Sequence, residues 1–250
     1  MKAIDVHAHY GKWFFPIESD STDAILEMME KNDIEKAVLS SSLAIIYDFR
    51  EGNARLAGAI RDCPDLYAYV FLNPNYIKES IFEMKKYLGE NPKFLGLKLY
   101  SDGYTEQPLD CPGHRKILEV LSKKYPQYPV LFHCYSQYSA LQLIKLAKDF
   151  SNLKFIMGHM GGWEWKKAAE SVKQINSIYL ELCSGIAVQG RIEEVVSEIG
   201  AERVMFGSDM TLLNPSWTLG MVESAGLSAE KKELILYGNA SRLFRLPAGG

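Results

Sequence analysis

The sequence has few cysteines, no long apolar run and no strong excess of either charge. The four cysteines are scattered through 250 residues without a Cys-x-x-Cys pair, which argues against a disulfide framework and favours a cytoplasmic protein with reduced thiols. No apolar stretch approaches the roughly 20 residues that span a bilayer, and Asp5 and His7 interrupt the apolar N-terminal segment, so we recognise no signal peptide. The net charge of −3 gives no sign of a nucleic-acid or membrane partner.

Repeats, low-complexity segments and Gly/Ser-rich linkers are also lacking. The composition, with 47% hydrophobic and 24% charged residues, is typical of a soluble globular protein. We therefore expect a single domain over residues 1–250, which is long enough for one large core.

Eight short apolar runs alternate with longer amphipathic stretches. Near-continuous apolar runs are typical of parallel strands that are buried on both faces. The predicted strands are Ala3–Val6, Ala37–Leu39, Tyr67–Leu72, Phe94–Tyr100, Val130–Phe132, Phe155–Met157, Ile178–Leu182 and Val204–Phe206. The helices predicted from apolar spacing are Thr22–Lys31, Lys116–Tyr125, Ala140–Phe150, Glu164–Ile175 and Arg191–Ile199.

This alternation predicts an α/β fold, and the chain length favours a single-domain (β/α)8 TIM barrel. A doubly wound open sheet is the alternative, and alternation alone does not separate the two. The positions of the histidines favour the barrel, because a barrel brings the carboxyl ends of the first, fifth, sixth and eighth strands around one mouth.

Only five histidines are present, and four of them stand at the ends of predicted strands. His7 and His9 close the first strand, where alternate side chains share one face. His133 closes the fifth strand, His159 the sixth, and Asp209 the eighth. Imidazoles and a carboxylate gathered at one mouth suit a divalent metal ion such as Zn²⁺, with one coordination position left for water.

Several motifs occur in the order in which one enzyme family carries them. They are Asp5-Val6-His7-Ala8-His9, Gly96-Leu97-Lys98-Leu99, Phe132-His133-Cys134, Gly158-His159-Met160-Gly161-Gly162, Phe206-Gly207-Ser208-Asp209 and Gly238-Asn239-Ala240-Ser241-Arg242-Leu243-Phe244. The chain resembles the amidohydrolase superfamily, specifically the amidohydrolase-related family that also holds aminocarboxymuconate-semialdehyde decarboxylase-like enzymes. The sibling TatD-type nucleases typically carry Glu-Thr-Asp where this chain has Gly-Ser-Asp.

The resemblance implies a role for each matching residue. His7, His9, His133 and Asp209 match the ligands of one divalent metal ion, with Zn²⁺ favoured and Mn²⁺, Fe²⁺ or Co²⁺ as alternatives. His159 matches the histidine that acts as a general base or orients the reacting carbonyl. Asp209 is also expected to carry a proton to a leaving group. The resemblance is our only reason to expect a homodimer.

Lys98 raises a separate question, because binuclear members of the superfamily carry a carbamylated lysine on this strand that bridges two metal ions. We favour the other interpretation, in which Lys98 is a cation that pairs with an anionic group of the substrate or with a neighbouring acid. No arginine clearly matches the arginine that binds the substrate in the decarboxylases. Arg50 and Arg55 follow the second predicted strand, but the sequence is equally consistent with exposed positions on a surface helix.

Aromatic residues follow several of the predicted strands. Trp13, Tyr100 and Trp163 are expected to line a pocket for a ring or a small apolar body at the mouth, although packing beneath loops explains such residues equally well. The fifth histidine, His114, stands at a predicted helix start and is expected at the surface or as a cap.

The favoured function is hydrolysis of a small-molecule amide, lactone or ester by metal-activated water. The alternative is non-oxidative decarboxylation of a small unsaturated or aromatic acid in the same site. A barrel that only binds a ligand or a metal is a third hypothesis.

Overall fold

The computed structural model describes residues 1–17 and 20–246, and the remaining residues of the predicted domain 1–250 lie outside this description. One parallel sheet contains eight strands in chain order. They are β1 (Ala3–Tyr10), β2 (Ile34–Ser41), β3 (Leu66–Phe71), β4 (Phe94–Leu99), β5 (Val130–His133), β6 (Phe155–Gly158), β7 (Ile178–Glu181) and β8 (Val204–Met205). The structure thus contains all eight predicted strands, with ends that differ by a few residues.

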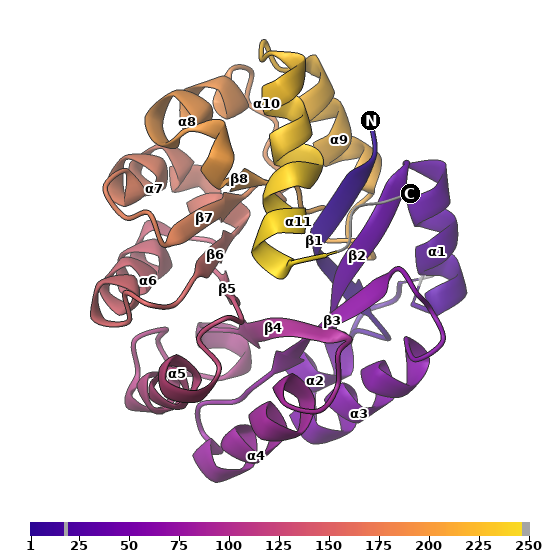
Figure 1. Cartoon of the computed structure of the whole chain (residues 1–250), viewed down its shortest axis with the longest axis vertical. Coiled ribbons are helices and arrows are strands. Elements are labelled where there is room, and N and C mark those ends of the chain that lie inside the picture. Colours follow the sequence, from indigo (N-terminus) through magenta and orange to yellow (C-terminus); the bar gives the residue numbers. More distant parts are fainter. Residues whose placement is uncertain (18–19, 247–250) are drawn as a thin grey trace.

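Backbone hydrogen bonds join the last strand region to the first. Val6 N donates to Phe206 O at 3.1 Å, and Asp209 N donates to His7 O at 2.7 Å. Because these bonds connect the segment after β8 with β1, the sheet closes into a barrel around which the helices form an outer ring (Figure 1). The predicted single-domain (β/α)8 TIM barrel is confirmed, and the open sheet is excluded.

The helices on the described chain include every predicted one and several more. They are α1 (Thr22–Lys31), α2 (Ser42–Ile46), α3 (Phe49–Ala59), α4 (Ile77–Leu88), α5 (Pro112–Lys124), α6 (Gln137–Asp149), α7 (Trp165–Val172), α8 (Arg191–Ile199), α9 (Pro215–Ser224), α10 (Ala229–Glu233) and α11 (Asn239–Phe244), with short turns η1 (Asp102–Tyr104), η2 (His159–Glu164), η3 (Ala201–Arg203) and η4 (Leu234–Gly238). Among these described helices, none is both long and apolar enough to cross a membrane.

Local chemistry explains where the helices begin. The side chain of Ser21 accepts a hydrogen bond from Ala24 N, so α1 starts at Thr22 as predicted. The predicted bounds of α8 also agree with the structure. At the start of α5 the cap is Cys111, whose sulfur accepts from His114 N. His114 itself is fully buried, so its predicted place at the surface or as a cap was wrong.

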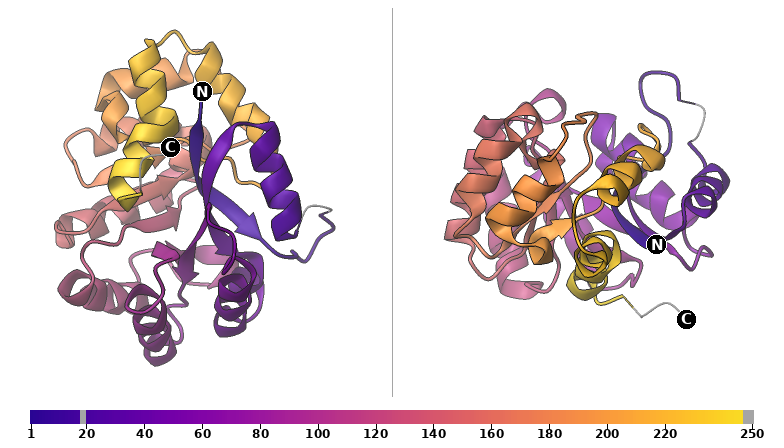
Figure 2. Two further views of the ribbon diagram at one scale, coloured as in Figure 1. Left: turned by 45° about the vertical axis from the view of Figure 1, so that its right-hand side comes forward. Right: turned by 90° about the horizontal axis from the view of Figure 1, so that it is seen from above.

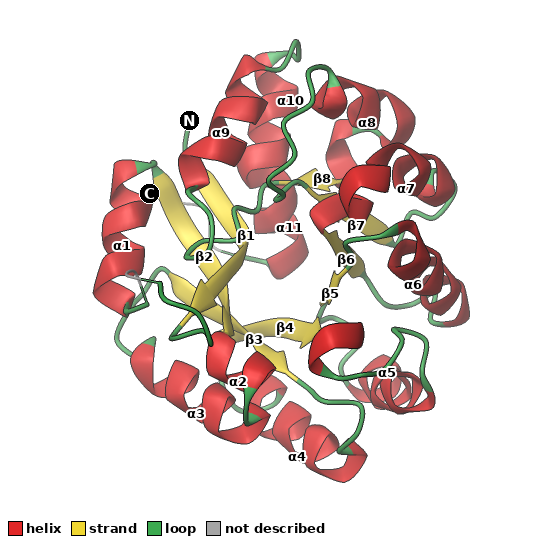
Figure 3. Ribbon diagram, turned by 180° about the vertical axis from the view of Figure 1, so that it is seen from behind, coloured by secondary structure: helices red, strands yellow, loops and turns green. Residues whose placement is uncertain are grey.

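The two ends of the barrel differ in what fills them. One end holds an apolar cluster, in which strand residues pack against Ala240, Phe244 and Leu246 at the C-terminal helix α11. Asn239 fastens this helix by donating to the carbonyls of Ala201 and Val204, both at 2.7 Å. Figure 2 places α11 at the opposite end of the barrel from the loop that follows β1. Figure 3 looks onto that other end, where the loops that follow the strands meet.

Candidate metal centre at the carboxyl ends of the strands

His7 and His9 share the mouth side of β1. The strand continues to Tyr10, so both histidines lie within it rather than just beyond it. Both side chains are fully buried, and their ring centroids are 5.5 Å apart. The pairing of β1 with β2 shifts register between Asp5 and Ala8, an irregularity of the kind that redirects side chains next to functional sites.

Asp209 approaches both of these histidines from the loop after β8. Its Oδ1 lies 3.0 Å from His9 Nε2 and 3.7 Å from His7 Nε2. Burial alone would raise the pKa of Asp209, but the imidazoles of His9, His7 and His159 hold that pKa well below its usual value. The carboxylate is therefore ionised near neutral pH, which is the form that binds metal ions and accepts protons.

His133 and His159 extend the group of imidazoles. His159 Nε2 lies 2.9 Å from His133 Nδ1, and the rings of His159 and His7 are 4.9 Å apart. His133 thus joins the cluster through His159, whereas His7 and His9 face Asp209 directly. The group whose potential ligand atoms lie within 4.8 Å of one another contains His7, His159, Cys183 and Asp209.

The four imidazoles are electrically neutral in this setting. Burial is the main cause that lowers the pKa of each, and it does so most strongly for His7 and His133. Neutral imidazole has a free lone pair, which metal coordination requires.

Glu181, at the end of β7, was missed by the sequence analysis. Its Oε2 lies 2.9 Å from His7 Nδ1 and accepts from His159 N at 3.2 Å, while Oε1 accepts from Cys183 N. Burial raises the pKa of Glu181. Because the carboxylate accepts a hydrogen bond from the Nδ1–H group of His7, it orients the lone pair of Nε2 toward the mouth. The rule that found the histidines, a polar residue ending a buried strand, would also have found Glu181.

The position of Glu181 also explains why the first residue of the Gly-Ser-Asp segment is a glycine. A Cβ atom at Gly207 would lie 2.3 Å from Glu181 Oε1, so no larger residue fits beside the carboxylate. Asp5 holds the same segment, because it accepts from Ser208 N at 3.1 Å and from His7 N at 3.0 Å. Burial raises the pKa of Asp5 to about 7. Asp5 therefore acts by fastening β1 to the loop that carries Asp209.

Lys98 points into the cluster from β4. Its side chain is fully buried, with Nζ 2.7 Å from His7 Nε2 and 5.0 Å from the centroid of the Tyr100 ring. Burial lowers the pKa of Lys98 to about 8, which leaves the ammonium form dominant at neutral pH. Lys98 therefore places a positive charge at the floor of the mouth.

The three predicted pocket aromatics lie in different environments. Tyr100 stacks on His133 with centroids 4.3 Å apart, and Trp13 meets His9 edge-on at 5.1 Å. Trp163 is 73% exposed, and among the described residues its ring does not contact a ring of the cluster. A pocket of about 220 Å³ opens onto His133; it is lined by Tyr100, Ser101, Gly103, Tyr104, His133, Tyr135, Ser136 and Ser139.

The backbone is left-handed at two of the predicted functional residues. His159 has φ 61° and Asp209 has φ 62°, a region that non-glycine residues seldom adopt. Such conformations cost about 1–3 kcal/mol each and persist where the surrounding structure enforces them, often at functional sites. The two strained residues, His159 and Asp209, are those for which the sequence predicts a role in the reaction.

The donor set fits a divalent metal ion. His9 is fully buried; among the described residues its Nδ1 has no hydrogen-bond partner, and its Nε2 lies 3.0 Å from Asp209 Oδ1 without an aligned hydrogen bond. A buried imidazole nitrogen that lacks an aligned partner is costly unless something binds it. Neutral imidazole nitrogens beside an ionised carboxylate are ligands that Zn²⁺, Mn²⁺, Fe²⁺ and Co²⁺ accept.

Comparison with protein families identifies the relationship. The sequence profile described as amidohydrolase matches residues 4–246. The chain belongs to the amidohydrolase family. A search among curated proteins gives no match.

Solved structures share the fold at low sequence identity. A protein from Staphylococcus aureus named as an amidohydrolase has a TM-score of 0.80 at 19% identity, over 98% of this chain and all (100%) of that one. A dihydroxybenzoic acid decarboxylase from a Polaromonas species, with bound manganese and the inhibitor 2-nitroresorcinol, has a TM-score of 0.77 at 18% identity, over 98% and 97%. An amidohydrolase from Burkholderia multivorans with bound zinc has a TM-score of 0.77 at 15% identity, over 99% and 100%.

Proposed function

We propose that this protein is a metal-dependent decarboxylase of a small aromatic or unsaturated carboxylic acid. The observation that carries the proposal is the aromatic pocket beside His133, in which Tyr100 stacks on the imidazole at 4.3 Å and Tyr135 lies parallel to it at 6.3 Å. Such walls suit a flat ring. The buried ammonium of Lys98 at the floor suits an anion, and the Polaromonas relative is a decarboxylase.

The metal would be held by His7, His9, His133 and Asp209. A divalent ion bound there supplies a Lewis acid that polarises oxygen atoms of the substrate. We leave its identity open among Zn²⁺, Mn²⁺, Fe²⁺ and Co²⁺, because one relative binds manganese and another zinc. A second ion on a carbamylated Lys98 is the less favoured arrangement.

The reaction is redox-neutral. The bond between the substrate carbon and its carboxylate breaks, carbon dioxide leaves, and the electron pair on that carbon takes one proton. Asp209, which is ionised at rest, accepts a proton from the solvent before the bond breaks and delivers it to this carbon. His159 orients the substrate from its fixed position between Cys183 and His133, and Trp13 excludes water above His9.

Hydrolysis of an amide, lactone or ester is the second candidate. It is favoured by the ionised state of the Asp209 carboxylate beside neutral imidazoles, because an ionised carboxylate is the form that can accept a proton from an attacking water. The two reactions differ in their products: decarboxylation releases carbon dioxide, and hydrolysis releases an amine or alcohol with an intact acid.

The test is a product assay on the metal-loaded protein with two panels, one of hydroxybenzoates and unsaturated acids and one of amides, lactones and esters. We expect carbon dioxide from at least one acid, together with the decarboxylated ring or alkene. Turnover of amides, lactones or esters alone would contradict the proposed decarboxylase activity and would show that the protein is a hydrolase. A His159→Ala variant should lose turnover and keep its metal; loss of the metal would make His159 a ligand instead.

A further inference from the structure

Cys183 faces the metal centre from the segment that follows β7. It stands two residues beyond Glu181, and residues two apart along an extended chain lie on the same side. Its side chain is fully buried, and its Sγ lies 3.1 Å from His159 Nδ1 and 3.4 Å from His7 Nδ1. Cys183 is a free thiol. A sulfur atom thus contacts two imidazoles of the cluster.

The sulfur belongs to a compact group of potential ligand atoms. One atom from each of His7, His159, Cys183 and Asp209 lies within 4.8 Å of the other three. Ligand atoms on one tetrahedral zinc ion stand roughly 3.5 Å apart, because their bonds to the ion are about 2.0–2.3 Å long. An ion bound by His7 and Asp209 would therefore lie within reach of the sulfur.

A second observation indicates an ion beside these residues. His9 is fully buried; among the described residues its Nδ1 has no hydrogen-bond partner, and its Nε2 lies 3.0 Å from Asp209 Oδ1 without an aligned hydrogen bond. An ion held by both side chains would satisfy the Nε2 lone pair. Because Asp209 also belongs to the group that contains Cys183, the same ion would lie near the sulfur.

A divalent ion would leave an excess of buried positive charge around this group. Among the described residues near it, the cations are Lys98 and Arg191, and the carboxyl groups are Asp5, Glu181 and Asp209. Even with all three ionised, these carboxylates carry one negative charge fewer than the ion and the two cations together. A buried charge is costly unless an opposite charge lies beside it. A thiolate at the ion would supply that charge.

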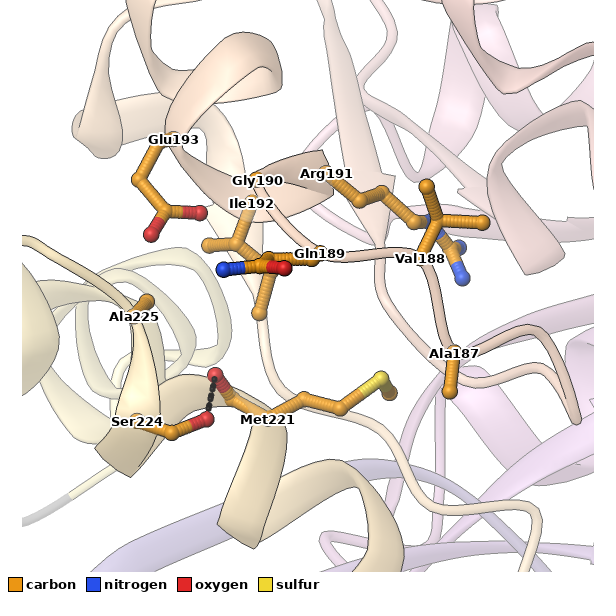
Figure 4. Close-up of a pocket in the computed structure, with 10 residues that line it drawn as sticks. All are labelled: Ala187, Val188, Gln189, Gly190, Arg191, Ile192, Glu193, Met221, Ser224 and Ala225. Carbon is orange, nitrogen blue, oxygen red and sulfur yellow. Dashed lines mark hydrogen bonds between the residues drawn. The ribbon is translucent and has the colours of Figure 1, made fainter.

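The acidic residue nearest to Arg191 along α8 does not offset this excess. Glu193 Oε1 accepts from Gly226 N at 2.6 Å. Figure 4 shows the Arg191 side chain running behind Val188, to the opposite side of a pocket of about 300 Å³ from the Glu193 carboxylate. The charge of Arg191 therefore stays on the side of the metal centre.

We propose that Cys183 is a thiolate ligand of the metal ion at the mouth and that it makes the site bind Zn²⁺ in preference to Mn²⁺. Thiolate is a soft donor that favours zinc, whereas manganese favours oxygen donors. Without an ion the thiol keeps its proton, because burial raises the pKa of Cys183 well above its usual value. When the ion binds, the S–H bond breaks, a sulfur–metal bond forms and the proton passes to solvent. The inference rests on the metal centre of the proposed function and narrows the choice of ion that it leaves open.

The test is the absorption spectrum of the protein loaded with Co²⁺, which gives an intense sulfur-to-metal charge-transfer band in the near ultraviolet when a thiolate is its ligand. We expect this band in the wild type, saturating at about one equivalent per chain, and we expect Cys183→Ser to bind cobalt without it. Cys134 is equally buried but belongs to the large apolar cluster of strand and helix residues, so Cys134→Ser should keep the band. A band that persists in Cys183→Ser, or that is absent from the fully loaded wild type, would overturn the proposal.

Competition with a chelator tests the preference for zinc. In Cys183→Ser the Kd of Zn²⁺ should rise by at least about tenfold, while the Kd of Mn²⁺ changes less than about threefold. Equal changes for both ions would mean that the serine only disturbs the site, and the proposal would be wrong. If Cys183→Ser does not fold, X-ray absorption of the zinc-loaded wild type decides, with a sulfur neighbour expected at about 2.3 Å and only nitrogen and oxygen neighbours as the contrary result.

The outcomes separate this inference from the proposed function. A sulfur ligand in a protein that releases no carbon dioxide from any acid would support the role of Cys183 and contradict the decarboxylase. Carbon dioxide release by a cobalt-loaded protein that lacks the band would support the decarboxylase and refute the role of Cys183.

Discussion

The two ends of the barrel share the same strands but have opposite chemistry. We call the end that is covered by α11 the closed end. There, Leu131 of β5 and Ile156 of β6 belong to an apolar cluster with Phe244 of α11. Two or three residues further along the same strands, the chain reaches His133 and His159. One layer of apolar side chains thus supports the ionisable groups and separates them from water at the far end.

This difference explains the electrostatics of the mouth. Burial over an apolar layer lowers the pKa of each imidazole, and it would raise the pKa of Asp209 if the histidines did not oppose it. We infer that the closed end contributes stability and the mouth contributes chemistry. Substitutions at the two ends should therefore have separable effects.

The largest expected effect is on turnover, from Asp209→Asn at the mouth. The amide keeps the shape of the side chain but neither carries a negative charge nor accepts a proton, so turnover should fall by about 10²- to 10⁴-fold. The melting temperature should fall only modestly, because a carboxyl whose pKa is lowered in the folded state contributes some stability at neutral pH, and the variant loses that contribution. Steady-state kinetics and thermal unfolding measure the two effects. Asp149→Asn, at an exposed carboxylate, is the control, and turnover within tenfold of wild type in Asp209→Asn would contradict the assigned role.

At the closed end, Phe244→Ala should produce the opposite result. Removal of the buried ring leaves a cavity, and we expect a loss of about 3–5 kcal/mol in the free energy of unfolding. Metal content should stay at the wild-type level in the folded protein. Phe82→Ala, at a ring that is 67% exposed, should change stability by less than about 0.5 kcal/mol. Denaturant unfolding with metal analysis would reveal whether the ends are coupled, since loss of metal in folded Phe244→Ala would refute their independence.

His114 tests whether burial alone keeps a histidine neutral, because it lies outside the metal cluster. Its Nδ1 is 3.1 Å from Leu109 O, and burial lowers its pKa to about 4. The unfolded chain binds this proton near pH 6.5, so His114 lowers stability as pH falls from about 6.5 to 4, by up to about 3 kcal/mol. In His114→Gln this part of the pH dependence should vanish. Unfolding free energies at pH 7 and pH 4 measure it; equal slopes in variant and wild type would mean that His114 titrates normally.

The smallest expected effect is on metal affinity, from Glu181→Gln. Glutamine offers one acceptor oxygen where His7, His159 and Cys183 require two, so the orientation of His7 should loosen. We expect metal affinity to fall about 10- to 100-fold in competition with a chelator. Glu83 is a buried carboxylate outside the cluster that is paired with Asn53, so Glu83→Gln should keep wild-type affinity. Equal losses in the two variants would indicate general destabilisation rather than a role for Glu181 at the mouth.

Much of the fold could be predicted from sequence because buried parallel strands have a strong apolar signal. The same runs located the four histidines and Asp209 at strand ends. Helices such as α2 and α11 were not predicted individually, because at five and six residues they are too short for a clear apolar period. The expectation for His114 failed because its burial depends on packing against Phe132, which is distant in the sequence.

The details of the site depend on loop geometry that no motif encodes. Met160, Gly161 and Gly162 all have positive φ, and the turn that they form leads to Trp163, whose side chain is 73% exposed. Arg191 reads as the first residue of a surface helix, and only the course of the loop after β7 buries it. The positions of residues along a strand could therefore be predicted from the sequence. The positions of side chains in the loops beyond the strand ends could be determined only from the structure.

Metal content per chain, measured on protein purified without added metal, tests the central claim most directly. We predict about one equivalent of a divalent ion in the wild type and almost none in a His7→Ala/His9→Ala variant that remains folded. About two equivalents would indicate a second ion at a modified Lys98. No metal in the wild type, even after reconstitution, would contradict the metal centre at the mouth of the barrel.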